Sequence, residues 1–238
     1  MKSSAIFVRL FTLVLFLSLS LSTYAQVTGN GNIKEETRSL SGFSAIHASS
    51  GVDVILDQGG TEKVVVRSDE NLLDYVITEV EGNTLVLKTK GSIRKAKALE
   101  VHVTVKTLDR LEASSGSDVE TRSKLSVNEL VVKMSSGSDL TMDIEANEMT
   151  CNLSSGSDAN LSGKVGVLVA EASGGSDISA KKLDVTKCTI KATGGSDAVL
   201  HVTGELDLEA RGASDIRYTG RPNVLSSKAS GGSDIYGN

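Results

Sequence analysis

The sequence predicts an all-β protein that folds as a right-handed parallel β-helix, a solenoid with coils of about 19–20 residues. Two observations lead to this prediction. A five-residue motif, Ser-Ser-Gly-Ser-Asp or a close variant, recurs at intervals of 18 to 21 residues between its aspartates. Apolar and polar residues alternate on both sides of each copy, and a period of two is typical of strands with one buried face.

The final aspartate of each motif marks the repeat. The regular copies end at Asp118, Asp139, Asp158, Asp177, Asp197, Asp215 and Asp234, and a degenerate earlier copy ends at Asp53. A nearly fixed period indicates structural units that stack on one another. A β-propeller is the alternative, but its blades need about 40 residues or more. The solenoid therefore fits better.

Each coil is expected to contain about three short strands, with a bend at the glycine of the motif. Equivalent inward positions of successive coils would then form ladders of apolar side chains, of which Leu130, Met149 and Leu168 are one example. Ala213 stands where the other copies have glycine. This exception suggests that not every bend needs a positive φ.

The first 25 residues have the pattern of a secretory signal peptide. Lys2 and Arg9 accompany a short apolar run, and small residues lead to Ala25, so we expect cleavage between Ala25 and Gln26. The apolar run is about 12 residues long, which is short for a membrane anchor. No later stretch is apolar enough to cross a bilayer. We expect secretion across the inner membrane to the periplasm, the cell surface or the medium.

The mature chain, residues 26–238, is expected to form a single domain. Residues 26–98 would supply irregular N-terminal coils, and residues 99–238 the regular ones. The interval between Asp53 and Asp118 would hold about three coils plus an insertion. Within it we expect strands at residues 63–67, 76–80 and 84–88, a helical turn at 71–75 and a basic surface loop at 91–97.

Composition limits the possible functions. The formal net charge of −5 argues against nucleic acid as a partner. Aromatic residues make up 3% of the chain, whereas proteins that bind bases or sugars commonly use stacking rings. The two cysteines, Cys151 and Cys188, fall in coils two apart. That separation is about 9.6 Å at strand spacing, beyond the reach of a disulfide, so both thiols should be free and buried.

Three segments resemble the N-terminal signature of a known family. They are residues 29–38 (Gly-Asn-Gly-Asn-Ile-Lys-Glu-Glu-Thr-Arg), 41–46 (Ser-Gly-Phe-Ser-Ala-Ile) and 68–75 (Ser-Asp-Glu-Asn-Leu-Leu-Asp-Tyr). The family is the putative auto-transporter adhesin, head GIN domain, and the Ser-Gly-Ser-Asp repeats resemble its C-terminal half. The resemblance implies a secreted or envelope β-helical protein of bacteria, with adhesion as the suggested role and no catalytic residues. The sequence shows no C-terminal translocator barrel, so we expect no self-export.

The column of aspartates is the first candidate site. Stacked carboxylates about 5 Å apart could bind Ca²⁺, which takes six to eight oxygen ligands. The calcium-binding β-helix repeat, however, has a period of nine and a ligand turn on both sides of each coil. We therefore expect a structural column, in which each Asp and its Ser accept backbone N–H bonds at the bend as Asx turns do. No metal or other cofactor is predicted.

Nucleophilic catalysis is the second candidate. His47, His102 and His201 are the only histidines, and no Gly-x-Ser-x-Gly elbow accompanies them. We expect ordinary surface histidines and a non-enzymatic module that binds an envelope or surface ligand, either a glycan or a protein. A carbohydrate-active β-helical enzyme and a purely structural envelope protein remain alternatives. The oligomeric state stays open.

Overall fold

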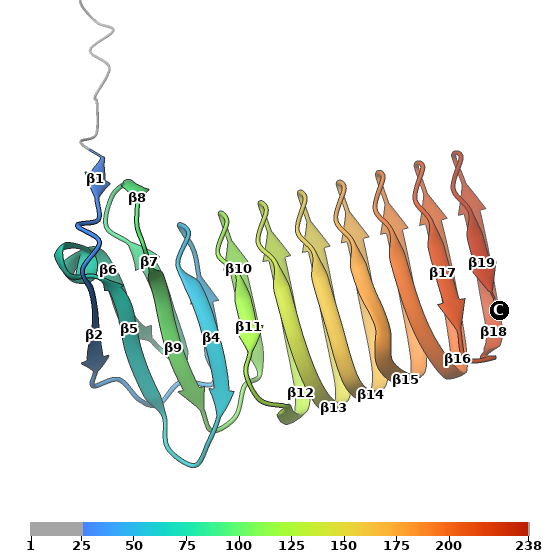
Figure 1. Ribbon diagram of the computed structural model, residues 1–238. Coiled ribbons are helices and arrows are strands. Elements are labelled where there is room, and N and C mark those ends of the chain that lie inside the picture. The colour runs from blue at the N-terminus through green and yellow to red at the C-terminus, as the bar shows by residue number, and fades with distance from the viewer. Residues whose placement is uncertain (1–25, 238) are drawn as a thin grey trace, which may run out of the picture.

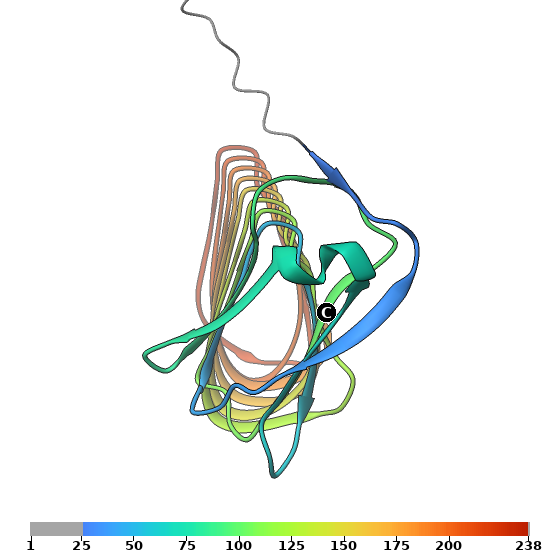
Figure 2. The ribbon, with the colours of Figure 1, turned by 90° about the vertical axis from the view of Figure 1, so that its left-hand side faces the viewer.

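The computed structural model describes residues 26–237, and the predicted signal peptide, with Ala25, lies outside them. The chain forms a β-solenoid whose successive coils stack side by side (Figure 1). Seen along its axis, each coil has a narrow edge and a rounded, wider edge (Figure 2). The predicted fold class, a parallel β-helix, is confirmed.

Each regular coil contains one long strand. These strands are β12 (Leu125–Ser135), β13 (Leu140–Ser154), β14 (Ala159–Ser173), β15 (Ile178–Thr193) and β16 (Ala198–Arg211). They pair in parallel, in register from β12 to β14 and with local register shifts in the pairings of β15, so that Leu130 lies beside Met149 and Met149 beside Leu168. The predicted ladder is confirmed. The expectation of three short strands is wrong, because each strand continues around the wide edge and is interrupted only at the motif.

Alternation of apolar and polar residues produces the core. Inward residues are almost completely buried, as in β13, where Leu140, Met142 and Ile144 are at most 1% exposed. The buried side chains form one continuous cluster between Phe43 and Ile216. Each fully buried aliphatic side chain contributes about 1.5–3 kcal/mol, so this ladder is the main source of stability.

Both cysteines are free and buried, as predicted. Cys151 on β13 pairs with Ala170 of β14, and Cys188 on β15 pairs with Leu168, which also lies on β14. The two thiols therefore lie two coils apart. Burial raises the pKa of each thiol to about 12.

The coil of Asp53 lies directly beside the coil of Asp118. The first coil consists of β3 (Ala45–Ala48) and β4 (Asp53–Gln58), and the second of β10 (Arg110–Ser114) and β11 (Val119–Thr121). These strands pair in parallel, β3 with β10 and β4 with β11. The prediction that about three coils separate Asp53 from Asp118 is wrong. The intervening chain lies on the N-terminal side of the Asp53 coil, and the Asp118 coil follows on the other side of that coil.

That intervening chain caps the N-terminal end of the solenoid. β7 (Thr84–Thr89) and β9 (Leu99–Val105) form one more coil, parallel to β3 and β4. β5 (Lys63–Asp69) and β6 (Val76–Glu81), joined by the 3₁₀ helix η1 (Glu70–Tyr75), pair antiparallel with β9 and β7. β2 (Ile33–Arg38) pairs antiparallel with β5, and β1 (Val27–Thr28) pairs with β8 (Ile93–Lys95). The predicted strands and helical turn are confirmed, and the reversal of strand direction ends the parallel stack.

The chain ends with β17 (Ile216–Thr219), β18 (Asn223–Ser230) and β19 (Ile235–Gly237), which form the last coil and the start of the next. β18 pairs with β16, and β19 with β17. This coil is more exposed than the others, with Leu225 56% accessible. Within residues 26–237, no helix is long and apolar enough to span a membrane.

Candidate functional site

The motif forms the narrow edge of each coil from Asp53 to Asp234. The residues three and two positions before the aspartate both have a left-handed backbone, with φ of 58° at Ser155 and 72° at Gly156. Ala213 also has a positive φ, 65°. The expectation that Ala213 escapes this conformation is wrong, because the bonds to both neighbouring coils fix the bend whatever residue occupies it.

The motif serines form a buried ladder inside this edge. Each serine Oγ accepts the backbone N–H of the equivalent residue in the preceding coil, as Ser157 does from Ser138 at 3.2 Å. Seven such bonds, 3.0–3.2 Å long, run from Val52 to Ser233. All but one of these serine side chains are 0% exposed, and Ser233 is 8% exposed. The inward orientation of these serines was not predicted from the sequence.

The aspartates form a second ladder on the outer side. Each Oδ1 accepts the backbone N–H of the aspartate in the following coil at 2.9–3.2 Å, from Asp53 to Asp234. All eight predicted aspartates therefore lie together, and their structural role is supported by these bonds. The expected Asx turns are wrong in one respect: the bonds join neighbouring coils instead of closing a turn within one coil.

The carboxylates of the aspartate ladder are partly engaged by hydrogen bonds from the next coil. One oxygen of each carboxylate up to Asp215 already accepts an N–H, and residues 26–237 contain no cluster of three or more potential metal ligands. At Asp53, burial raises the pKa and outweighs the lowering effect of the bond from the Asp118 N–H. Accepting this N–H bond therefore does not depress the pKa of Asp53.

The structure does not bring the three histidines together. His47, His102 and His201 lie on β3, β9 and β16. The Nε2 atom of His102 is 3.2 Å from Oε2 of Glu100, and Nδ1 of His201 is 2.9 Å from Oγ1 of Thr219. These contacts are pairings on the outer surface of the strands.

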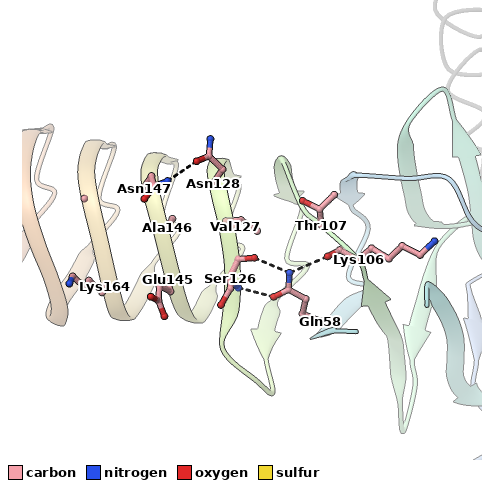
Figure 3. A pocket seen from close by; sticks show the side chains of 11 residues that line it. Gln58, Lys106, Thr107, Ser126, Val127, Asn128, Glu145, Ala146, Asn147 and Lys164 are labelled. Carbon is pink, nitrogen blue, oxygen red and sulfur yellow. Dashed lines mark hydrogen bonds between the residues drawn. The ribbon is translucent and has the colours of Figure 1, made fainter. Parts of the chain in front are cut away.

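A polar groove lies at the opposite, wide edge, where the irregular coils meet the regular ones (Figure 3). Its volume is about 690 Å³. We call it the amide groove, and its lining residues are Gln58, Lys106, Thr107, Ser126, Val127, Asn128, Glu145, Ala146, Asn147, Lys164 and Gly166. This volume falls within the range typical of ligand sites.

Side-chain amides organise the amide groove. Gln58 bridges two coils, because its Nε2 donates to the carbonyls of Lys106 and Ser126 and its Oε1 accepts the Ser126 N–H at 2.8 Å. Asn147 Nδ2 donates to Asn128 Oδ1 at 2.7 Å. A Cβ at Gly166 would lie 2.6 Å from the Asn147 carbonyl oxygen, so only glycine fits there without displacement. This groove was not predicted from the sequence, where the recurrence of Asn128 at Asn147 is its one visible signal.

The family follows from the sequence match. Residues 42–222 match the family model described as putative auto-transporter adhesin, head GIN domain. The chain belongs to this family. Comparison with curated proteins gives no match.

Several solved structures share the fold of this chain. A putative adhesin from Bacteroides fragilis superimposes with a TM-score of 0.82 at 19% identity, covering 89% of this chain and all of that one. A putative adhesin from Parabacteroides distasonis gives 0.73 at 22% identity over 90% of this chain and all of its own. A putative lipid-binding protein from the same species gives 0.73 at 20% identity over 89% and 99%. At these identities the likeness shows the fold alone.

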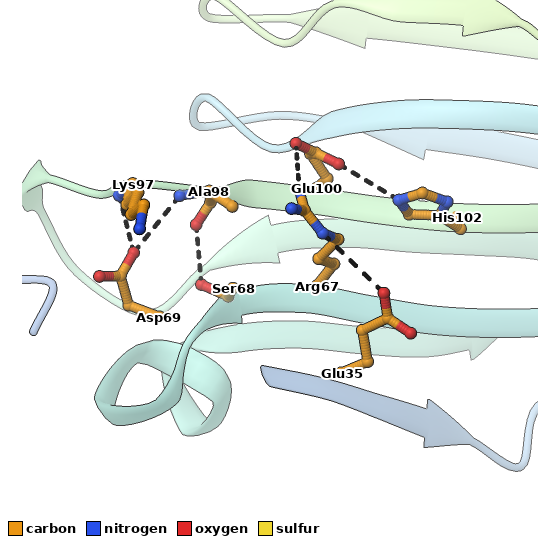
Figure 4. Close-up of polar contacts among 8 residues, drawn as sticks. All are labelled: Glu35, Arg67, Ser68, Asp69, Lys97, Ala98, Glu100 and His102. Atoms are coloured by element: carbon orange, nitrogen blue, oxygen red, sulfur yellow. Dashed lines mark hydrogen bonds and ion pairs between the residues drawn. The ribbon is translucent and has the colours of Figure 1, made fainter. Parts of the chain in front are cut away.

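The N-terminal signature of this head GIN domain protein surrounds a buried carboxylate (Figure 4). Asp69 is 0% exposed and accepts the backbone N–H groups of Gly31, Lys97 and Ala98 at 2.5, 2.7 and 3.4 Å. Burial raises the Asp69 pKa, but these bonds outweigh that effect and hold the pKa below its usual value. A Cβ at Gly29 would lie 2.4 Å from this carboxylate. The signature therefore fastens the first strands to the cap.

A charged row continues the aspartate ladder onto the cap. Glu100 pairs in register with Asp53, and Arg67 Nη1 binds Glu100 Oε1 at 2.9 Å (Figure 4). Glu35 lies 3.9 Å from Arg67 Nε. Arg67 thus offsets the negative charge at the N-terminal end of the ladder.

Proposed function

We propose that this protein is an exported, non-catalytic binding module of the bacterial envelope, and that the amide groove contacts a glycan. The observation that carries the proposal is the lining of this groove. Side-chain amides and a hydroxyl of Gln58, Asn128, Asn147 and Ser126 surround an open volume of about 690 Å³. Such groups both donate and accept hydrogen bonds, which suits the hydroxyl groups of a sugar.

The lining of the groove supports binding over turnover. Glu145 is the one carboxylate among its lining residues, whereas glycoside hydrolases place a pair of carboxylates across the scissile bond. Lys106 and Lys164 are the lining cations. Membership in a family described as putative adhesins agrees with a surface ligand. Export would follow cleavage between Ala25 and Gln26.

A glycan array and a binding screen with envelope extracts, using the mature protein, test this proposal. The double variant Asn128→Ala/Asn147→Ala should lose binding by about tenfold, since two hydrogen-bonding amides contribute ~1.4 kcal/mol or more together. The matched control, Asn152→Ala/Asn160→Ala, removes two amides outside the groove and should bind normally. Equal losses in both variants would contradict the groove assignment. Shortened glycan products after incubation would contradict the absence of catalysis.

A further inference from the structure

The narrow edge changes its charge at one place. In the coil formed by β7 and β9, the bend between the strands is a longer loop, residues 90–98, instead of the aspartate motif. This loop carries Lys90, Arg94, Lys95 and Lys97, all exposed. The same edge carries one aspartate per coil in the next eight coils. The repeat is therefore broken where the sign of its charge reverses.

These cations are available to a ligand. None of the four forms an ion pair with a carboxylate of residues 26–237, although the protein has a formal net charge of −5. The ammonium group of Lys97 lies 3.5 Å from the Gly31 carbonyl oxygen. Four like charges within eight residues repel one another, and an anion would relieve that repulsion.

A cleft adjoins the charges. Its volume is about 470 Å³, and it lies between the bend of the Asp53 coil and the basic loop. Ser50, Gly51, Ser92, Arg94 and Lys95 are among its lining residues. The loop is held in place on both sides, because β8 pairs with β1 and the Lys97 N–H binds the buried Asp69. The cations are thus presented by an anchored loop beside a preformed cleft.

We propose that this basic cleft is a second binding site, which takes the acidic groups of an anionic polysaccharide. Arg94 and Lys95 would contact carboxylate, phosphate or sulfate groups, and the serine hydroxyls would contact the sugar. The site lies at the narrow edge, away from the amide groove, and does not depend on the function proposed for that groove.

The surroundings of the cleft favour a polysaccharide over a lipid surface or a nucleic acid. Ile93 is the only large aliphatic residue of the loop, and it is partly buried and paired with Val27. The exposed large apolar residues of the described chain all lie on β14, β18 and β19, so no apolar group stands ready to enter a bilayer here. None of the described residues that line the cleft is aromatic, so they offer no ring for base stacking.

Binding of polygalacturonate fragments to the mature protein tests the site, with fully methyl-esterified fragments as the uncharged comparison. The acidic fragments should bind, and the esterified ones should not. Binding should weaken when ionic strength rises from about 0.01 M to about 0.1 M, since the screening length falls from ~30 Å to ~10 Å. The double variant Arg94→Gln/Lys95→Gln should bind about tenfold more weakly, as expected for two exposed charge contacts.

The matched control is Lys181→Gln/Lys182→Gln, which removes the same charge from two adjacent exposed lysines elsewhere. It should retain wild-type affinity. An equal loss in the control would show a nonspecific charge effect and overturn the proposal. So would binding to phosphatidylglycerol vesicles or to single-stranded oligonucleotides in the absence of polygalacturonate binding. The groove variant Asn128→Ala/Asn147→Ala should leave polygalacturonate binding unchanged, which separates this site from the amide groove.

Discussion

The buried serine ladder should contribute more stability than the exposed aspartate ladder. The perturbation is Ser157→Ala. Its Oγ accepts the Ser138 N–H, and both serines are 0% exposed. Without this acceptor, the N–H is left unpaired where water does not reach it, at a cost of about 1–3 kcal/mol. The coils above and below restrict any relaxation that could supply another acceptor.

The comparison is Asp158→Ala in the same motif. Asp158 Oδ1 accepts the Asp177 N–H at 3.0 Å, but this bond is exposed, so water replaces the lost acceptor. Removal of one carboxylate also relieves repulsion from its neighbours in the column, which is about 1 kcal/mol or less in water. The net change should stay within about 0.5 kcal/mol of zero.

Urea unfolding measures both variants. The chain has no tryptophan, so circular dichroism and tyrosine fluorescence are the two probes, and coincident transitions justify a two-state treatment. Ser157→Ala should lower the midpoint at constant m. Ser179→Ala, a partly exposed serine outside the ladder, should leave it unchanged. A larger loss for Asp158→Ala than for Ser157→Ala would refute the reasoning.

Four further predictions concern single features of the fold. Asp69→Asn should destabilise the protein by about 1.5–3 kcal/mol at neutral pH, because an amide NH₂ would face N–H donors. The stability of the wild-type protein should fall as the pH drops through the depressed pKa of Asp69. An unchanged midpoint of acid unfolding in the variant would contradict this. Gly156→Val should destabilise the protein more than Gly156→Ala does, as measured by urea unfolding. The φ of Gly156 is 72° and the space around a new Cβ is open, so the cost is backbone strain of about 1–2 kcal/mol or more. Equal costs for the two variants would argue against strain. Cys151 and Cys188 should resist a thiol reagent until the protein unfolds, since their pKa is about 12; rapid native labelling or a bridge in mass spectrometry would oppose this. A chelator should leave the melting temperature unchanged, because the ladder carboxylates already accept N–H bonds, and a drop of many degrees would instead indicate bound calcium.

The repeated part of the candidate site was predictable, and the unrepeated part was not. The aspartate column follows from the fixed period of the motif, and the inward apolar ladders follow from the alternation within each copy. The inward direction of the serines is in phase with this alternation, since Leu153, Ser157 and Ala159 are two or four residues apart and all buried; it was missed because a polar side chain is not expected in a core. The amide groove was missed because Gln58 reaches Ser126, 68 residues away.

The sequence by itself determined the coil length, the residues that face the core and the place of each bend, since these depend on local spacing and backbone preference. Only the tertiary structure decided that Asp53 lies beside Asp118, that β5 and β6 reverse direction to cap the stack, and that Asp69 is buried among distant N–H groups. Those features depend on which coil neighbours which. A repeat of nearly identical coils offers several such pairings, and the core contacts of the N-terminal strands select one of them.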